Sequence, residues 1–222
     1  MFATLVGMRD VPPPRAVPDV RADPRLRTLA TLPDPRSAAL PVDTLLRDVL
    51  PDGLVRGRTV ACSGDAAVSL GLHLVAAATQ AGSWLALFDD GHVGLLAAHE
   101  RGVALQRTVL VSPPRDPGSW SSALATAVDG FAVVAAFPPR GASPSDLRRV
   151  QTRVQARGAV LVLVDPRRRV STSYADVVLV TRTRAWHGID QGSGHLESRD
   201  VEVDVSGRRT ARPRRVALRI AG

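Results

Sequence analysis

The sequence contains no lysine and no asparagine, and all 29 of its basic residues are arginine. A P-loop nucleotidase uses a lysine that reaches the β- and γ-phosphates, and Schiff-base chemistry requires a lysine amine. Both chemistries are therefore excluded in their usual form. Because lysine and asparagine codons are AT-rich, GC-rich coding explains most of this composition. The informative question is which residue stands where a lysine would be needed.

Cysteine, aromatic residues and long apolar runs are also scarce. The single cysteine, Cys62, excludes a disulfide framework and a cysteine-based zinc site, and we expect it to be an inert core thiol in a reducing compartment. Aromatic residues make up 4% of the 222 residues, so a core drawn from 45% hydrophobic residues must be mainly aliphatic. No apolar run approaches the roughly 18 residues of a membrane span, and residues 1–8 make a poor signal peptide. We expect a cytoplasmic protein that does not enter the membrane.

The net charge of +8 is unevenly distributed along the chain. Residues 41–165 carry equal numbers of arginines and acidic residues, whereas residues 166–222 carry twelve arginines and six acidic residues. This asymmetry indicates contact with a polyanion on the C-terminal side. The alternative is that arginine-rich coding decorates exposed strands and loops.

The chain divides by composition into an arm and a regular domain. Nine of the 17 prolines fall in residues 1–51, and residues 1–40 are predicted to form a Pro/Arg-rich arm with one short helix near 22–32. Residues 41–222 form the domain. Its predicted helices are 42–50, 66–80, 93–101, 118–129 and 144–157, and its predicted strands are 58–62, 83–88, 108–111, 131–137 and 159–164.

Strands such as 131–137 and 159–164 are apolar without alternation, which is typical of parallel strands covered on both faces. Alternating strands and helices of this length predict an α/β fold whose mostly parallel sheet is flanked by helices. Beyond residue 165 the segments 176–182, 195–205 and 214–220 alternate more strongly. We expect residues 166–222 to extend the sheet as a basic, antiparallel C-terminal part.

One strand, loop and helix has the frame of a phosphate-binding P-loop. The strand 58–62 leads into Ser63-Gly64-Asp65 and then into a helix. Gly64 keeps the first glycine of that motif, and Asp65 places a negative charge in the loop. The second glycine, the lysine and the Ser/Thr of the motif are replaced in turn by Ser69, Leu70 and Gly71. Biased coding would replace a lysine by arginine, not by leucine.

The context of this loop resembles RecA-type recombinases, through residues 57–60, 72–80 and 84–92. The chain from about residue 40 to its end is most similar to the ImuA-prime type of RecA-like protein, an accessory factor of the actinobacterial SOS mutasome. The residues that carry this resemblance are Gly82-Ser83-Trp84, 94–105, 157–162, 186–196 and 211–216. The resemblance implies a RecA-like core.

Against the RecA pattern, the chemical losses are systematic. The glutamate that polarises water would follow Asp89, where the chain has Asp90 and Gly91, and the metal-binding aspartate would fall near Ala135. Together with the missing lysine and hydroxyl, four requirements for ATP hydrolysis have lapsed. We therefore expect no enzyme activity, no cofactor and no metal site, since the five histidines also lack ligands at suitable spacing.

The resemblance implies a non-catalytic adaptor in SOS-induced mutagenic translesion synthesis, associated with the nucleoid. Its implied partner is an ImuB-like homologue of Y-family polymerases, which links to the sliding clamp and to an error-prone replicative-type polymerase. Two alternatives stay open. One is a remnant ATPase or nucleotide sensor that uses an arginine in place of the lysine, and the other is a regulator of RecA or an inhibitor of cell division.

Two arginine clusters are candidate contacts for the DNA backbone or for an acidic partner. The first, Arg167, Arg168 and Arg169, follows the strand 159–164, where a DNA-binding loop leaves the sheet in the resembled recombinases. Guanidinium groups there can contact phosphates without reading sequence. A solvated charged edge is the alternative. The second cluster lies in the C-terminal tail and comprises Arg208, Arg209, Arg212, Arg214 and Arg215.

Overall fold

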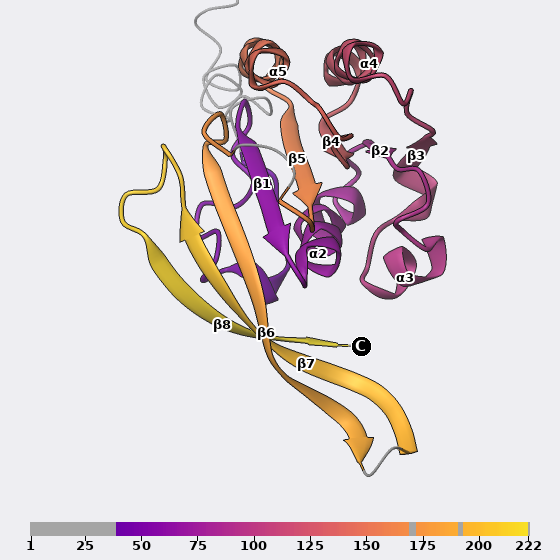
Figure 1. Ribbon diagram of the computed structural model, residues 1–222, viewed down its shortest axis with the longest axis vertical. Helices are drawn as coiled ribbons and strands as arrows, with labels where there is room; N and C mark the ends of the chain where they lie inside the picture. The colour runs from indigo at the N-terminus through magenta and orange to yellow at the C-terminus, as the bar shows by residue number, and fades with distance from the viewer. Residues whose placement is uncertain (1–38, 169–171, 191–192, 222) are drawn as a thin grey trace, which may run out of the picture. The chain divides into compact units, whose positions relative to one another are not determined.

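The computed structural model describes residues 39–168, 172–190 and 193–221 (Figure 1). The chain divides into two units, Met1–Asp34 and Pro35–Gly222, and the described residues all belong to the second. The predicted arm over residues 1–40, with its helix, therefore lies outside the described residues except for Ala39 and Leu40. Leu40 forms an isolated antiparallel bridge with Leu54.

The described unit is built on one sheet of eight strands in the order β3-β2-β4-β5-β1-β6-β7-β8. The pairs from β3 to β6 are parallel, and the pairs β6–β7 and β7–β8 are antiparallel. The strands are β1 (Thr59–Gly64), β2 (Leu85–Phe88), β3 (Thr108–Val111), β4 (Val133–Ala136), β5 (Val160–Asp165), β6 (Val177–Asp190), β7 (Ser193–Ser206) and β8 (Arg214–Ala221). The predicted α/β fold, with its antiparallel C-terminal extension, is confirmed.

Helices cover both faces of the parallel part. Val60 and Cys62 of β1 belong to the hydrophobic cluster that includes α2 and α3, whereas the intervening Ala61 belongs to the cluster that includes α4 and α5. Both sides of β1, β2, β4 and β5 are thus dry, which explains their continuous apolar sequence, whereas the edge strand β3 is partly exposed. The helices are α2 (Ala67–Gln80), α3 (Leu95–Glu100), α4 (Pro117–Gly130) and α5 (Pro144–Arg157), and the short 3-10 helices are η2 (Thr44–Leu46) and η3 (Leu105–Arg107).

The ends of α5 follow from its local sequence. The Ser143 hydroxyl accepts a hydrogen bond from the Asp146 amide at 3.1 Å, and Pro144 occupies the first turn. Gly158 ends the helix with a left-handed φ of 67°. The predicted helix 144–157 is confirmed. α4 is capped by Asp116, whose carboxylate accepts from the Ser119 amide at 2.7 Å.

The predicted helix over 42–50 is replaced by the 3-10 turn η2 and a following turn. The Asp43 carboxylate caps η2 by accepting from the Leu45 amide at 3.0 Å. The bridge between Leu40 and Leu54 ties the two ends of this segment together. Because the chain must turn back within that span, it has no room for a longer α-helix.

The C-terminal extension consists of the long antiparallel strands β6 and β7, which continue past the end of β1, and of β8, which pairs with β7 (Figure 1). Val201, Val203 and Val205 of β7 are buried against the core. Asp200, Glu202 and Asp204 alternate with them and therefore lie on the opposite face. No helix among the described residues has both the length and the hydrophobicity needed to cross a membrane.

Candidate functional site

The loop between β1 and α2 is too short to form a phosphate cradle. In a P-loop, several residues between the two glycines direct their backbone amides at the phosphates. Here β1 ends at Gly64 and α2 begins at Ala67, so Asp65 and Ala66 alone join them. The residues that would wrap a phosphate have instead become the first turn of α2.

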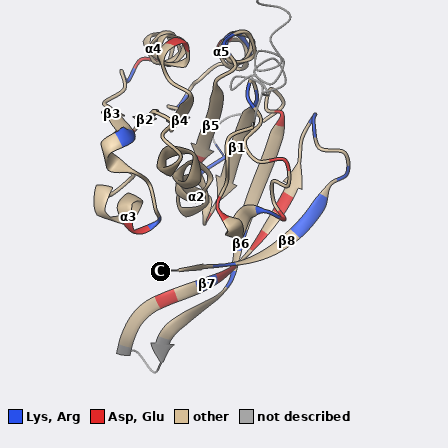
Figure 2. Cartoon of the chain, turned by 180° about the vertical axis from the view of Figure 1, so that it is seen from behind, with Lys and Arg blue, Asp and Glu red and all other residues tan. Residues whose placement is uncertain are grey.

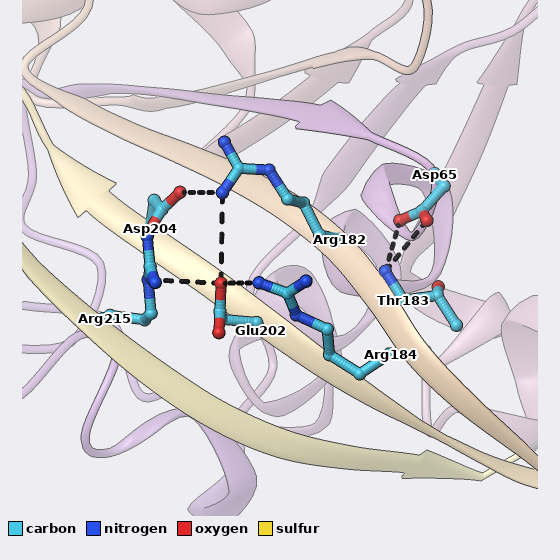
Figure 3. A network of polar contacts seen from close by, with 7 residues as sticks. All are labelled: Asp65, Arg182, Thr183, Arg184, Glu202, Asp204 and Arg215. Carbon is cyan, nitrogen blue, oxygen red and sulfur yellow. Dashed lines mark hydrogen bonds and ion pairs between the residues drawn. The ribbon is translucent and has the colours of Figure 1, made fainter.

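Hydrogen bonds fasten this short loop to β6. The Ala66 amide donates to the Thr181 hydroxyl oxygen at 3.0 Å, and that hydroxyl donates to the Ser63 carbonyl at 3.0 Å. The Asp65 carboxylate accepts from the Thr183 amide at 2.8 and 3.1 Å, as the dashed lines show (Figure 3). The polar groups of the loop are thus used within the protein.

Gly64 is required by the close approach of β6. It adopts a φ of +100°, and a Cβ atom there would overlap the carbonyl oxygen of Thr181. Glycine alone combines this backbone conformation with this absence of side-chain volume. The glycine at the position of the first P-loop glycine is therefore needed for the close packing of β1 against β6.

The positions of the P-loop lysine and hydroxyl lie in the core. Leu70 is fully buried in the cluster around α2. A Cβ atom on Gly71 would lie 2.7 Å from Cγ2 of Val164 in β5, so this glycine allows α2 to pack closely on the sheet. A side chain at position 70 points into the hydrophobic layer, and the loop does not fit a nucleoside triphosphate with its magnesium ion.

Arg199 of β7 completes the closure of the loop. Its guanidinium donates to the Ser69 hydroxyl at 2.7 Å and to the Asp65 carbonyl at 3.5 Å, and it lies 5.0 Å from the centre of the Trp186 ring. Burial lowers the pKa of Arg199, and the charge of Asp65 opposes that shift. This residue was not predicted from the sequence. The sequence pattern that could have identified it is the alternation along β7, which places Arg199 on the same face as the buried valines at 201, 203 and 205.

The turn after β2 stands where the RecA pattern has its catalytic glutamate. Asp89 is buried, and its carboxylate accepts from the amides of His92 and Val93 at 2.9 and 3.0 Å. His92 Nδ1 lies 2.7 Å from Asp90, and its ring stacks on Phe137 at 4.7 Å. One ligand-type atom from each of Asp89, Asp90 and His92 lies within 4.8 Å of the others. Because Asp89 uses both oxygens on backbone amides, this group stabilises the turn.

A crevice of about 380 Å³ opens at the carboxyl ends of β2, β3, β4 and β5. β2 leads to α3 on one face of the sheet, whereas the neighbouring β4 leads to α5 on the other face. Such a reversal leaves an opening between the two strand ends, where open α/β sheets bind ligands. The lining residues are Asp90, His92, Pro113, Pro114, Arg115, Trp120, Phe137, Pro138, Pro139, Arg140, Val164, Asp165, Pro166 and Arg167.

The crevice contains part of the first predicted arginine cluster. Arg167 lines it, the neighbouring Arg168 is exposed, and Arg169 lies outside the described residues. The structure adds Arg115 and Arg140, which were not predicted from the sequence. Their signal was the repeated Pro-Pro-Arg after the third and fourth strands.

The second predicted cluster is dispersed and mostly paired. Arg208 donates to Asp176 at 3.2 Å and to the Tyr174 carbonyl at 2.9 Å, and Arg209 lies 4.0 Å from Asp176. Arg214 donates to the backbone carbonyls of residues 48 and 49. Asp176 precedes β6 and accepts from the Thr59 amide at the start of β1, so Arg208 and Arg209 lie at the sheet edge opposite the crevice.

Arg215 belongs to a ladder of charges on the exposed face of the extension (Figure 3). It lies 2.8 Å from Asp204 and 3.1 Å from Glu202, and on the other side Arg182 and Arg184 approach the same two carboxylates at 2.9 and 2.6 Å. Acidic segments of β7 thus lie beside basic segments of its neighbours (Figure 2). Of the second cluster, Arg212 alone has no hydrogen bond or ion pair within the described chain. Most of the basic charge on this extension is therefore neutralised.

The fold and the β1–α2 loop together define an α/β protein with the frame of a P-loop and a closed, internally bonded loop. The chain belongs to the family of the MT3502 N-terminal domain, whose model matches residues 48–169. This match spans β1 to β5 and the whole crevice, and it ends before the antiparallel extension. No curated protein matches the chain significantly.

Proposed function

We propose that the chain is a non-catalytic RecA-like adaptor of SOS-induced mutagenic translesion DNA synthesis. The observation that carries this proposal is the closure of the β1–α2 loop by Thr181, Thr183 and Arg199. A RecA-like frame without room for a triphosphate favours a role in binding other macromolecules over a role in an ATP-driven cycle. The protein then works in the cytoplasm, at the nucleoid.

The proposed partner is an ImuB-like, non-catalytic homologue of Y-family polymerases. Through that homologue the complex would reach the sliding clamp and the error-prone replicative-type polymerase. The support is the sequence resemblance, which extends through the tail beyond the family match at residue 169. We therefore propose that the partner binds the extension, which lies outside the part of the chain that the family model matches.

Affinity purification of the tagged chain from DNA-damaged cells tests the partner. We expect the Y-family homologue to be recovered with it. Recovery of RecA or of a division GTPase in its place would contradict the adaptor role and favour a regulator or inhibitor. The variant Trp186→Ala tests whether recovery of the partner depends on the extension. Trp84→Ala is its matched control, since both side chains are about half exposed.

Direct contact with the DNA backbone is a second part of the proposal. Arg167 lines the crevice and Arg168 follows it in the chain; both are exposed, and neither side chain has a polar partner among the described residues. Each phosphate contact that is lost should reduce the salt dependence of DNA binding by about one unit of slope. The double variant Arg167→Glu/Arg168→Glu should therefore lose retention on DNA at low salt, whereas Arg47→Glu, at an exposed arginine outside both predicted clusters, should not. Unchanged retention of the double variant would remove this loop from the proposal.

A further inference from the structure

Three arginines follow three strands of the parallel sheet in the same way. Pro113-Pro114-Arg115 follows β3, Pro138-Pro139-Arg140 follows β4, and Pro166-Arg167 follows β5. Because parallel strands end at one edge of a sheet, this pattern brings the three side chains to one place. All three line the crevice.

These arginines differ from those of the extension in having no partners. Within the described chain, Arg115, Arg140 and Arg167 make no hydrogen bond or ion pair, whereas Arg182, Arg184 and Arg215 are all bound to carboxylates. Unpaired guanidinium groups that converge on a crevice form a site for an anion, and their planar fork matches the oxygens of a phosphate.

The two carboxylates that line the crevice are already engaged. Asp90 lies 2.7 Å from Nδ1 of His92. Asp165 is buried and interacts with another group of the protein. Neither carboxylate neutralises Arg115, Arg140 or Arg167 through a direct ion pair. The crevice therefore keeps a positive potential toward an incoming anion.

One residue of the crevice wall carries a buried polar atom without a partner. Trp120, from the first turn of α4, is 1% exposed and lines the crevice, and its indole Nε1 has no hydrogen-bond partner within the described chain. A buried N–H donor usually has an acceptor. Beside it, His92 stacks on Phe137 and remains 40% exposed, which provides an aromatic face.

We propose that this crevice binds a nucleotide, with its phosphate on Arg115, Arg140 and Arg167 and its base against the aromatic wall of His92. The volume of about 380 Å³ lies within the usual range for small-molecule sites. The prolines beside the arginines restrict the loops before binding, which lowers the entropic cost. The site is separate from the closed β1–α2 loop, and it does not depend on the adaptor role.

Indole N–H signals of ¹⁵N-labelled full-length protein test the proposal directly, because the chain has three tryptophans. Trp120→Phe assigns the crevice signal. Titration with deoxyadenosine monophosphate should shift the Trp120 signal saturably and leave that of Trp186, beside the closed loop, in place. Deoxyadenosine, which lacks the phosphate, should bind at least about tenfold more weakly, since charge-assisted hydrogen bonds are lost.

Single substitutions separate the crevice from general charge effects. Arg140→Gln and Arg115→Gln should each weaken the nucleotide about tenfold. Arg212→Gln makes the same change at an arginine of the turn before β8 and should have no effect. Equal weakening by Arg212→Gln, or no shift of Trp120 with the nucleotide, would overturn the proposal.

The same chemistry could come from a free nucleotide or from the phosphorylated end of a DNA strand. A short oligonucleotide with a 5′-phosphate and the same oligonucleotide without it distinguish the two sources. Stronger competition by the phosphorylated strand than by the mononucleotide identifies the strand end, and weaker competition identifies the free nucleotide. Equal shifts of Trp120 with both oligonucleotides would contradict recognition of a terminal phosphate and overturn the site as proposed.

Discussion

Position 70, where a P-loop has its lysine, is occupied by an apolar side chain. Leu70 is fully buried, and Gly71 beside it allows α2 to approach Val164. The two replacements support each other, because an apolar residue and a close helix–sheet contact both require a dry interface. The absence of lysine from the sequence thus has a structural counterpart at this position.

Restoring the lysine should damage the fold without restoring chemistry. In Leu70→Lys, an ammonium group would enter a hydrophobic layer without a counter-ion, which costs about 3–5 kcal/mol. Leu70→Met keeps the volume and should cost less than about 1.5 kcal/mol. Urea unfolding of both variants measures the difference. A stable Leu70→Lys protein that gains ATP hydrolysis would show that the position faces a nucleotide.

Gly64 allows a second test at the same loop. In Gly64→Ala, the alanine would have a left-handed φ and its Cβ would overlap the Thr181 carbonyl. We therefore expect the free energy of unfolding to fall by about 3 kcal/mol or more. Gly82→Ala is the matched control, because its φ is +94° and no atom lies within 4 Å of the added carbon. It should lose only about 1–2 kcal/mol, the cost of the backbone conformation. If both variants lose the same free energy of unfolding, β6 does not lie close enough to Gly64 to exclude a side chain there.

At the scale of elements, the hairpin of β6 and β7 carries paired charge. Hydrogen bonds from Arg219, and then from His187, lower the pKa of Asp200 to about 2. A carboxyl group with a lowered pKa stabilises the fold above its unfolded pKa near 4, and this contribution is lost as the pH falls toward 2. Added salt should weaken it, since these groups are exposed.

Arg219→Gln should therefore raise the pKa of Asp200 toward its ordinary value. Carboxyl ¹³C shifts followed from pH 6 to pH 1.5 measure the titration, and Arg212→Gln, which removes an arginine without a partner, should leave it unchanged. An Asp200 pKa that stays near 2 in Arg219→Gln would assign the shift to another group.

Local sequence predicted those elements whose signals are local. The helix 144–157 was predictable because Ser143, Pro144 and Gly158 mark both of its ends. The parallel strands were predictable because their apolar runs need cover on both faces. The helix over 42–50 was not, because the bridge from Leu40 to Leu54 restricts that segment from outside it.

The functional residues that sequence reasoning missed depend on contacts between distant segments. Arg199 reaches Ser69 across 130 positions of the chain. Arg115 and Arg140 meet Arg167 because the strand order places β3, β4 and β5 within one part of the sheet. The Pro-Arg repeat was visible in the sequence, but its convergence became evident only with the strand order.

At the scale of the whole described unit, the two edges of the parallel sheet have different roles. Asp176 fastens Arg208 and Arg209 at the edge where β1 begins. The opposite edge carries the closed β1–α2 loop and, beside it, the crevice with unpaired arginines. An anionic ligand is therefore expected to bind at the edge formed by the carboxyl ends of the strands, within the part of the chain that the family model matches.

The rate of phosphate release from ATP and magnesium, with and without single-stranded DNA, is the most direct test of the closed loop. The closure by Thr181, Thr183 and Arg199 predicts no turnover above background in either condition. Robust turnover that is abolished by Asp65→Ala, in a protein that stays folded, would contradict the closed loop. It would show that a nucleotide binds at the β1–α2 loop.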